Sequence, residues 1–251
     1  SWLPCKTCHT DAENNGDGRR MKLLDTTGGN TKLKKSGDSS EEYRLAGLSL
    51  MPDDILCPYR HIAGCADSCL ESAGMGVFAN VKAGRQRKTD WWHADKEGFL
   101  VQLRRELTNF EKLCTKQGVK AAVRLNVLSD IPWEKHGIPR QFPGIYFYDY
   151  TKNASRLGKT RSNYDLMYSY SGEPKYQQFV IKALKSNAPM SVVFRGGMPK
   201  HYMGRRVIDG DASDLVNVKA GAVIVGLKAK GKAKKDEGSF VVDATNLIAA
   251  A

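Results

Sequence analysis

Residues 145–150 read Ile-Tyr-Phe-Tyr-Asp-Tyr, a short run of β-forming side chains that is typical of a strand. Residues 121–128, Ala-Ala-Val-Arg-Leu-Asn-Val-Leu, form a second apolar run that predicts a buried strand. A helix is predicted over 96–119, because apolar side chains recur there every three or four positions until Gly118. Strands that alternate with helices along a chain indicate βα units and a parallel sheet.

The rest of the chain continues this alternation. Further apolar segments predict strands over 166–170, 191–194, 222–227 and 240–242, and a helix over 177–185. We therefore predict an α/β fold with a mostly parallel sheet. The residues from Cys57 onward are few for eight complete βα units, so an incomplete (β/α) TIM-like barrel is expected.

The balance of charge predicts the kind of partner. The 251 residues include 39 Lys and Arg against 27 Asp and Glu, which gives a formal net charge of +12 at pH 7. A surplus of this size attracts polyanions, so a nucleic acid or a nucleotide is the expected partner. Within the lysine-rich segment 228–235, the expected phosphate contacts are Lys228, Lys230 and Lys232. The alternative is a solvated surface whose charge only maintains solubility.

The first twenty residues differ from the rest of the chain. They are polar and rich in Gly and Asn, which predicts a flexible extension over 1–20, followed by a single catalytic-type α/β domain over 21–251. Residues 5–9, Cys-Lys-Thr-Cys-His, match a haem-attachment pattern, but nothing else indicates export, so chance or weak metal binding is preferred. Without a visible secretory signal or long apolar stretch, we expect no membrane contact and a cytoplasmic protein.

The densest chemical signal is Cys57-Pro-Tyr-Arg-His-Ile-Ala-Gly-Cys65-Ala-Asp-Ser-Cys69, which contains three of the six cysteines. If the chain turns helical at Gly64, Cys65 and Cys69 lie on one face. Three thiolates suit an iron–sulfur cluster, such as [4Fe-4S], with one open iron. The alternatives are zinc, with Cys114 or His61 as a fourth ligand, or small buried residues without a ligand.

Basic and aromatic side chains alternate in residues 85–93, Arg-Gln-Arg-Lys-Thr-Asp-Trp-Trp-His. In a nucleic-acid complex the cations hold phosphates while a Trp stacks on a base. The candidate contacts are Arg85, Arg87, Lys88 and Trp91. The alternative interpretation is the start of a helix whose Trp packs inward.

Three carboxylates follow one another closely at Asp209, Asp211 and Asp214. Such a group binds a cation or acts in acid–base chemistry, so Asp209 and Asp211 are the candidate catalytic residues. The simpler interpretation is that these side chains cap a turn.

The run Cys57…Cys65…Cys69-Leu-Glu-Ser-Ala-Gly74 resembles the signature of the phage gene-product-88 family, an uncharacterised family. Three later segments fit the same family in the same order: 124–130 (Arg-Leu-Asn-Val-Leu-Ser-Asp), 148–152 (Tyr-Asp-Tyr-Thr-Lys) and 207–211 (Val-Ile-Asp-Gly-Asp). The resemblance covers roughly residues 45–245.

The same order of motifs is more remotely similar to radical S-adenosylmethionine enzymes related to spore photoproduct lyase. In those enzymes a cysteine triad precedes strands that end in Ser-Asp, Thr-Lys and Ser-x-Glu, on a partial TIM barrel. The resemblance implies that the strand-end residues of this chain that bind S-adenosylmethionine are Ser129, Asp130, Lys152, Ser171 and Glu173. The triad spacing differs, with seven and then three residues between the cysteines here.

Polar residues at the carboxyl ends of parallel strands are also where α/β folds bind ligands in general. Simpler roles exist for the same residues: Ser129 and Asp130 as turn caps, Lys152 as a surface lysine, and Ser171 to Glu173 as a turn. If the ligand interpretation holds, the sulfurs of the triad converge beside these strand ends, whereas Cys114 lies elsewhere because its helix packs outside the sheet.

The leading hypothesis is therefore a phage-type radical S-adenosylmethionine-like iron–sulfur enzyme that acts on nucleic acid or a nucleotide. The first alternative is a non-radical enzyme that modifies DNA bases by glycosidic-bond or base-exchange chemistry, with Asp209 or Asp211 as nucleophile. The second is a non-catalytic, zinc-stabilised DNA-binding protein.

Overall fold

The computed structural model describes residues 21–26, 42–69, 74–160, 162–212, 215 and 219–249. The predicted extension over 1–20, with its Cys5–His9 motif, and Asp214 lie outside the described residues.

The described residues form a ten-stranded, mostly parallel sheet. Its order is β1-β2-β3-β4-β5-β6-β9-β8-β7, with β10 added beside β6. The strands are β1 (Leu24–Asp25), β2 (Tyr43–Leu48), β3 (Lys120–Arg124), β4 (Ile145–Thr151), β5 (Tyr164–Ser169), β6 (Met190–Arg195), β7 (His201–Tyr202), β8 (Arg205–Asp209), β9 (Ile224–Lys228) and β10 (Val241–Asp243). In this described sheet only the β1–β2 and β7–β8 pairs are antiparallel. The predicted α/β class is confirmed, and the described sheet stays open between β1 and β7.

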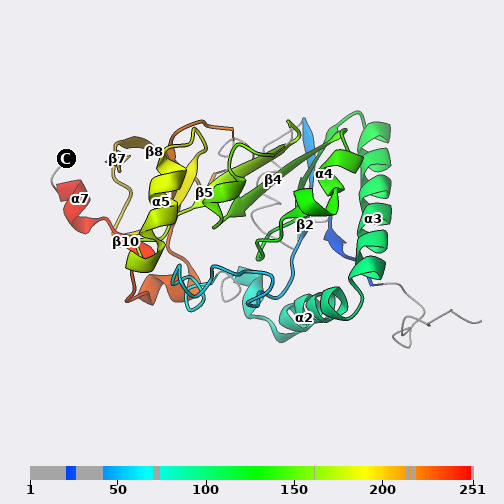
Figure 1. The fold of residues 1–251 in the computed structure, drawn as a ribbon, viewed down its shortest axis with the longest axis horizontal. Coiled ribbons are helices and arrows are strands. Elements are labelled where there is room, and N and C mark those ends of the chain that lie inside the picture. Colours follow the sequence, from blue (N-terminus) through cyan, green and yellow to red (C-terminus); the bar gives the residue numbers. More distant parts are fainter. Residues whose placement is uncertain are drawn as a thin grey trace, which may run out of the picture.

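Helices connect these strands and cover one face of the sheet. The α-helices are α2 (Ala79–Ala94), α3 (Lys96–Lys116), α4 (Ile138–Gln141), α5 (Gln177–Leu184) and α7 (Thr245–Ala249). The 3₁₀ helices are η2 (Gly74–Val77), η3 (Trp133–His136), η4 (Ala154–Arg156), η5 (Pro174–Tyr176) and η6 (Gly231–Lys235). Figure 1 shows α3 at one end of the molecule and α7 at the other. No helix among the described residues is long and apolar enough to cross a membrane.

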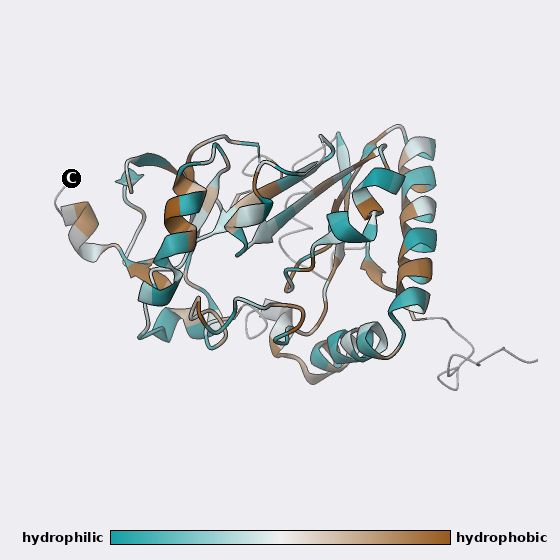
Figure 2. Ribbon diagram, viewed as in Figure 1, coloured by the Kyte–Doolittle hydropathy of each residue, from teal (hydrophilic) through white to brown (hydrophobic). Residues whose placement is uncertain are grey.

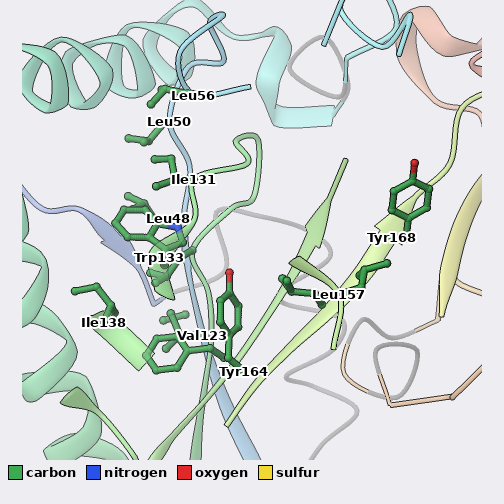
Figure 3. Packing of buried hydrophobic residues seen from close by; sticks show 14 of the residues in the cluster. Leu48, Leu50, Leu56, Val123, Ile131, Trp133, Ile138, Leu157, Tyr164 and Tyr168 are labelled. Atoms are coloured by element: carbon green, nitrogen blue, oxygen red, sulfur yellow. The ribbon is translucent and has the colours of Figure 1, made fainter. Parts of the chain in front are cut away.

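The larger hydrophobic core lies between the sheet and these helices. Helix α3 contributes Phe99, Leu103 and Leu107, which join one buried cluster with strand residues such as Val123. Figure 2 shows hydrophobic residues interspersed with hydrophilic ones along α3, as expected of a helix with one buried side. Figure 3 shows Trp133 packed close to Val123 within this core. The core therefore anchors both the strands and the segment that follows β3.

A smaller cluster lies on the opposite face, which we call the second face of the sheet. It is formed by Leu45, Ala122, Tyr148, Met167 and Val225, with further side chains at its margin. The strand register explains this grouping, because Leu45 is paired with Ala122 and every second residue along a strand shares a face. The second face carries tyrosines of β4 and, nearer the carboxyl ends, polar side chains.

The predicted helix over 96–119 is present as α3, whose start is capped by the Asp95 carboxylate accepting the Gly98 N–H at 2.9 Å. It ends before Gly118, which adopts a left-handed φ of 67°. The strand predicted over 121–128 is shorter than expected, since β3 ends at Arg124. The sequence analysis did not predict strands β1, β2, β7 and β8 or helices α2, α4 and α7 as such.

Candidate functional site

The three clustered cysteines lie on one loop, residues 53–69, which we call the cysteine loop. Its first turn is built by Asp53, whose carboxylate accepts the N–H groups of Ile55 and Leu56 at 2.9 and 2.8 Å. The carbonyl of Asp53 also accepts the N–H of Cys57 at 2.9 Å. These bonds fix the backbone at Cys57, and the Leu56 carbonyl accepts the N–H of Asp130 at 2.8 Å. The loop is thereby joined to the segment that follows β3.

The second half of the loop rests on Glu173. Gly64 has a left-handed φ of 61°, and a Cβ placed on it would lie 2.9 Å from Cγ of Glu173. Only glycine permits this approach without displacement. The Glu173 carboxylate also accepts the N–H of Ser239 at 2.9 Å. Glu173 therefore supports the cysteine loop from behind and does not line the cavity described next.

The cysteine loop covers the carboxyl ends of the parallel strands and encloses a cavity of about 280 Å³. In Figure 1 the loop is drawn in cyan and runs between α2 and the orange segment that precedes β10. Predicted site residues that line this cavity are Cys57, Cys65, Cys69, Ser129, Asp130, Lys152, Asp211, Lys228 and Lys230. Residues far apart in the sequence thus meet at one edge of the sheet.

The thiols of the loop lie in a partly buried environment. The Cys57 Sγ donates to the Leu128 carbonyl at 3.4 Å, and the Cys65 Sγ donates to the Arg60 carbonyl at 3.6 Å. Burial raises the pKa of Cys57, and negative charge at Asp130 raises it further. A thiolate at this place therefore needs a compensating cation. No three His, Cys, Asp or Glu side chains within the described ranges are grouped as ligands of a metal ion.

Lys152 supplies a cation next to the thiols. Only 9% of the residue is exposed, and its Nζ donates to the carbonyls of Ser169 and Tyr170 at 3.2 and 3.0 Å. The ammonium also lies 4.6 Å from the ring centre of Phe240. Burial lowers the pKa of Lys152, whereas the thiols and Asp130 act in the opposite direction. The surface-lysine interpretation does not fit this burial.

Asp130 is the centre of a buried ionic network behind the cavity. One carboxylate oxygen accepts the N–H of Lys152 at 2.8 Å, and the other lies 2.6 Å from the guanidinium of Arg156. Burial raises the pKa of Asp130 to about 6, although Arg156 opposes this shift. Arg156 also binds Glu134 with two bonds of 2.8 and 2.9 Å. The network thereby holds in place the backbone at Lys152 and the 3₁₀ helix η4, which contains Arg156.

Asn126 shapes the turn that presents Ser129 to the cavity. Its side-chain oxygen accepts hydrogen bonds from the Ser129 hydroxyl, the Ile131 N–H and the Trp133 indole, at 2.9, 2.9 and 3.1 Å. Its own N–H donates to Asp149 at 2.7 Å. Asp149 is fully buried, and burial raises its pKa to about 7, with the Asn126 bond opposing. Sequence analysis missed Asn126, although a polar residue inside an apolar run was a usable signal.

At the end of β5 the residue that reaches the cavity is Ser169, whereas the prediction named Ser171. Ser171 is fully buried and accepts the Glu173 N–H on its hydroxyl at 3.2 Å. The strand ends at Ser169, which is paired in register with Ser191 on the second face, and both serines line the cavity. The residue of β5 that lines the cavity thus lies two positions before the predicted Ser171.

The two candidate catalytic carboxylates are placed differently. The Asp209 carboxylate accepts the Asp211 N–H at 2.8 Å, which is the turn-capping arrangement, and Asp209 does not line the cavity. Asp211 does line it, and its oxygens bind the Lys228 N–H at 3.1 Å and the Lys230 ammonium at 2.5 Å. The geometry makes Asp211 the group that positions Lys230.

The predicted basic residues on α2 lie away from the cavity lining. Lys88 donates to the Leu23 carbonyl at 2.8 Å and so joins α2 to the segment that precedes β1. Trp91 packs edge-on against Phe99 with 5.5 Å between ring centres. Arg87 is exposed, and Arg85 is half-buried.

The residues proposed as a fourth zinc ligand lie apart from the cavity lining. Cys114 is buried on α3 within the larger core. His61 is exposed and contacts the Asp54 carboxylate at 2.7 Å. Lys232, on η6, is exposed and also outside the lining.

The fold and the site together define an α/β protein whose cysteine loop covers a cavity at the carboxyl edge of a parallel sheet. The chain belongs to the gene product 88 family, whose model matches residues 21–244. This match confirms the family resemblance carried by the cysteine run and the three later segments. No curated protein and no solved structure matches the chain.

Proposed function

We propose that this protein is an iron–sulfur enzyme of the radical S-adenosylmethionine type that acts on nucleic acid or a nucleotide. One observation carries the proposal: Cys57, Cys65 and Cys69 line a single cavity together with strand-end polar groups. The open, mostly parallel sheet supports an incomplete barrel of the kind that the remote similarity implies.

The chemistry of the donor set fits an iron–sulfur cluster. Thiolates are the usual ligands of such clusters, and a triad leaves one iron open for a cofactor. Zinc, the alternative, is held by four ligands in structural sites. The buried ammonium of Lys152 offsets the negative charge of the thiolates.

The residues around the triad have separate tasks in this proposal. Ser129 and Lys152 bind the polar ends of S-adenosylmethionine, while Asp130 holds the backbone of Lys152 in place. The rings of Tyr150 and Phe240 exclude water from the cavity. A cluster held by Cys57, Cys65 and Cys69 would supply an electron for reductive cleavage of S-adenosylmethionine, and with it the radical chemistry of the reaction.

The two alternatives draw less support from the site. A carboxylate nucleophile needs access to the substrate, but Asp209 caps a turn and Asp211 holds Lys230. A zinc-stabilised binding protein needs a fourth ligand, and neither Cys114 nor His61 lines the cavity. Metal analysis separates all three hypotheses.

The test is the metal content of the full chain purified without oxygen. We expect iron and sulfide with brown visible absorbance, and loss of both in Cys57→Ser, Cys65→Ser and Cys69→Ser. Cys114→Ser is the matched control and is expected to retain them, since Cys114 lies in the core away from the cavity. A protein that contains zinc and no iron, or a Cys114→Ser variant that loses iron equally, overturns the proposal.

A further inference from the structure

The cavity contains a second group of residues, of which the iron–sulfur proposal uses only Tyr150. Arg124 and Tyr150 extend from β3 and β4 on the second face of the sheet, and Ser191 extends from β6. Lys228 and Lys230 follow at the end of β9. These residues come from the sheet and its edge, whereas the thiols come from the cysteine loop.

Arg124 is a buried charge in this wall. Only 8% of the residue is exposed, and its guanidinium lies 4.4 Å from the ring centre of Tyr150. A guanidinium stays charged at any physiological pH, and its planar fork matches the oxygens of phosphate or carboxylate. Stacking on Tyr150 holds the guanidinium in one orientation. The cavity therefore contains a fixed cation that suits an anionic ligand.

Lys230 is a second fixed cation. The Asp211 carboxylate holds its ammonium at 2.5 Å and also accepts the Lys228 N–H at 3.1 Å. About half of the Lys230 side chain, 51%, remains exposed, so it is accessible to a ligand entering the cavity. Holding a long side chain in advance reduces the entropy lost when a ligand binds.

The charge of this group selects among anions. The cavity lining contains five basic residues, Arg60, Arg124, Lys152, Lys228 and Lys230, against the two carboxylates of Asp130 and Asp211, so positive charge is in excess. A phosphate monoester carries roughly −1.5 to −2 at pH 7, whereas a carboxylate carries one negative charge. The excess of positive charge in the cavity therefore favours a phosphate over a carboxylate as ligand.

We infer that Arg124 and Lys230, positioned by Tyr150 and Asp211, bind a phosphate group of the substrate. This inference rests on the proposed function, since it names the substrate class of the same cavity as a nucleoside phosphate. The phosphate belongs either to a free nucleotide or to the end of a nucleic-acid strand, and the two sources share the same chemistry.

The experiment measures binding of thymidine monophosphate and of thymidine to the full chain by equilibrium dialysis. We expect the monophosphate to bind at least tenfold more tightly than the nucleoside. Lys230→Gln is expected to weaken monophosphate binding by about tenfold, the loss of one charge-assisted hydrogen bond. The matched control is Lys232→Gln, on the same lysine-rich segment but outside the cavity lining, which is expected to leave binding unchanged.

Two further arms sharpen the test. Arg124→Gln is expected to weaken binding at least as much as Lys230→Gln, and Arg124→Lys keeps the charge should the neutral variant not fold. An oligonucleotide with a 5′-phosphate, compared with its 5′-hydroxyl form, shows whether a strand end is the better source. Equal binding of thymidine and its monophosphate, or equal losses in Lys230→Gln and Lys232→Gln, overturns the inference.

The outcome is separable from that of the iron–sulfur proposal. Cys57→Ser is expected to lose iron but to retain binding of thymidine monophosphate, because Cys57 belongs to the cysteine loop and the phosphate-binding residues belong to the sheet. Iron without phosphate binding overturns the inference alone. Phosphate binding without iron overturns the proposed function alone.

Discussion

The buried network around Arg156 and the cysteine loop meet at the same cavity, but different interactions hold them in place. In the network, Arg156 contacts Asp130 and Glu134 at 2.6 to 2.9 Å with little exposure to solvent. In the loop, the contacts of Asp53 with His93 and of Asp54 with His61 are more exposed, at 35% and 36% for the first pair and 67% and 72% for the second. Buried charges lose much more than exposed ones when a partner is removed. We therefore expect the network to determine stability and the loop to determine metal content.

The largest effect is expected from Arg156→Met. This change keeps much of the side-chain volume but leaves Asp130 and Glu134 without their buried cation. Removing one partner of a buried ion pair costs about 3–5 kcal/mol of unfolding free energy. Urea denaturation monitored by circular dichroism measures the loss.

The control for this change is Arg195→Met. Arg195 also forms an ion pair, with Asp243 at 3.3 Å, but both side chains are exposed, at 40% and 52%. Its guanidinium also donates to the Asp236 carbonyl at 2.8 Å, so we expect a loss of at most about 1 kcal/mol, well below that of Arg156→Met. If the two variants are equally stable, burial of the Arg156 network does not distinguish it from a surface pair.

The next effect is a pH dependence that originates at Asp149. Its pKa in the folded protein is raised to about 7 by burial, whereas an unfolded Asp titrates near about 3.9. Between these values the folded state binds more protons than the unfolded state, so stability falls as pH rises from about 4 to about 7. The slope for one group is at most about 1.4 kcal/mol per pH unit.

Asp149→Asn removes this titration while keeping the size of the side chain. As pH rises through this window, the unfolding free energy of the wild type is therefore expected to fall relative to that of the variant. Urea titrations at pH 4.5, 5.5 and 6.5 measure the difference. Parallel stability curves for the two proteins would show that Asp149 does not titrate there.

Strands in which apolar or aromatic side chains predominate were predictable, whereas β2 was not. Residues 145–150 and 191–194 are recognisable because both faces of these central strands are covered. The segment that forms β2, Tyr-Arg-Leu-Ala-Gly-Leu, contains a charge and a glycine and follows a turn-rich stretch. Helix α2 buries only Thr89 and Trp92 among the side chains that the structure describes, so its sequence carries little periodicity.

The site was predictable where chemistry is concentrated in the sequence. The cysteine run and the polar residues after two strands identify Cys57, Ser129 and Lys152, which meet at the cavity. Ser169 and Arg124 required the register of the sheet, because alternation decides which residue of a strand reaches the cavity. Arg156 is separated in sequence from both of its carboxylate partners, and no local pattern records such a pairing.

The smallest effects are expected in the cysteine loop, and they form a graded series. Asp53→Ala removes the acceptor of two N–H groups as well as the contact with His93, so a loss of about 1 kcal/mol is expected. His93→Ala removes only the side-chain contact of 2.6 Å, whose two groups are about one-third exposed, and a loss below about 0.5 kcal/mol is expected. His61→Ala removes a contact that is 67% and 72% exposed, so no measurable change is expected.

Iron content distinguishes positioning from stability in this series. Asp53 sets the backbone of Cys57 through its turn, so Asp53→Ala is expected to lower the iron bound per chain more than His93→Ala does. His61→Ala serves as the control, because its contact is with the Asp54 side chain, which makes none of the N–H bonds of that turn. Equal iron in all three variants would show that the turn at Asp53 does not position Cys57. If iron content falls in proportion to the unfolding free energy across the series, the loss of iron is instead explained by lower stability of the whole fold. The informative result is a loss of iron from Asp53→Ala in protein that remains fully folded at the assay temperature, since only displacement of the ligand explains it.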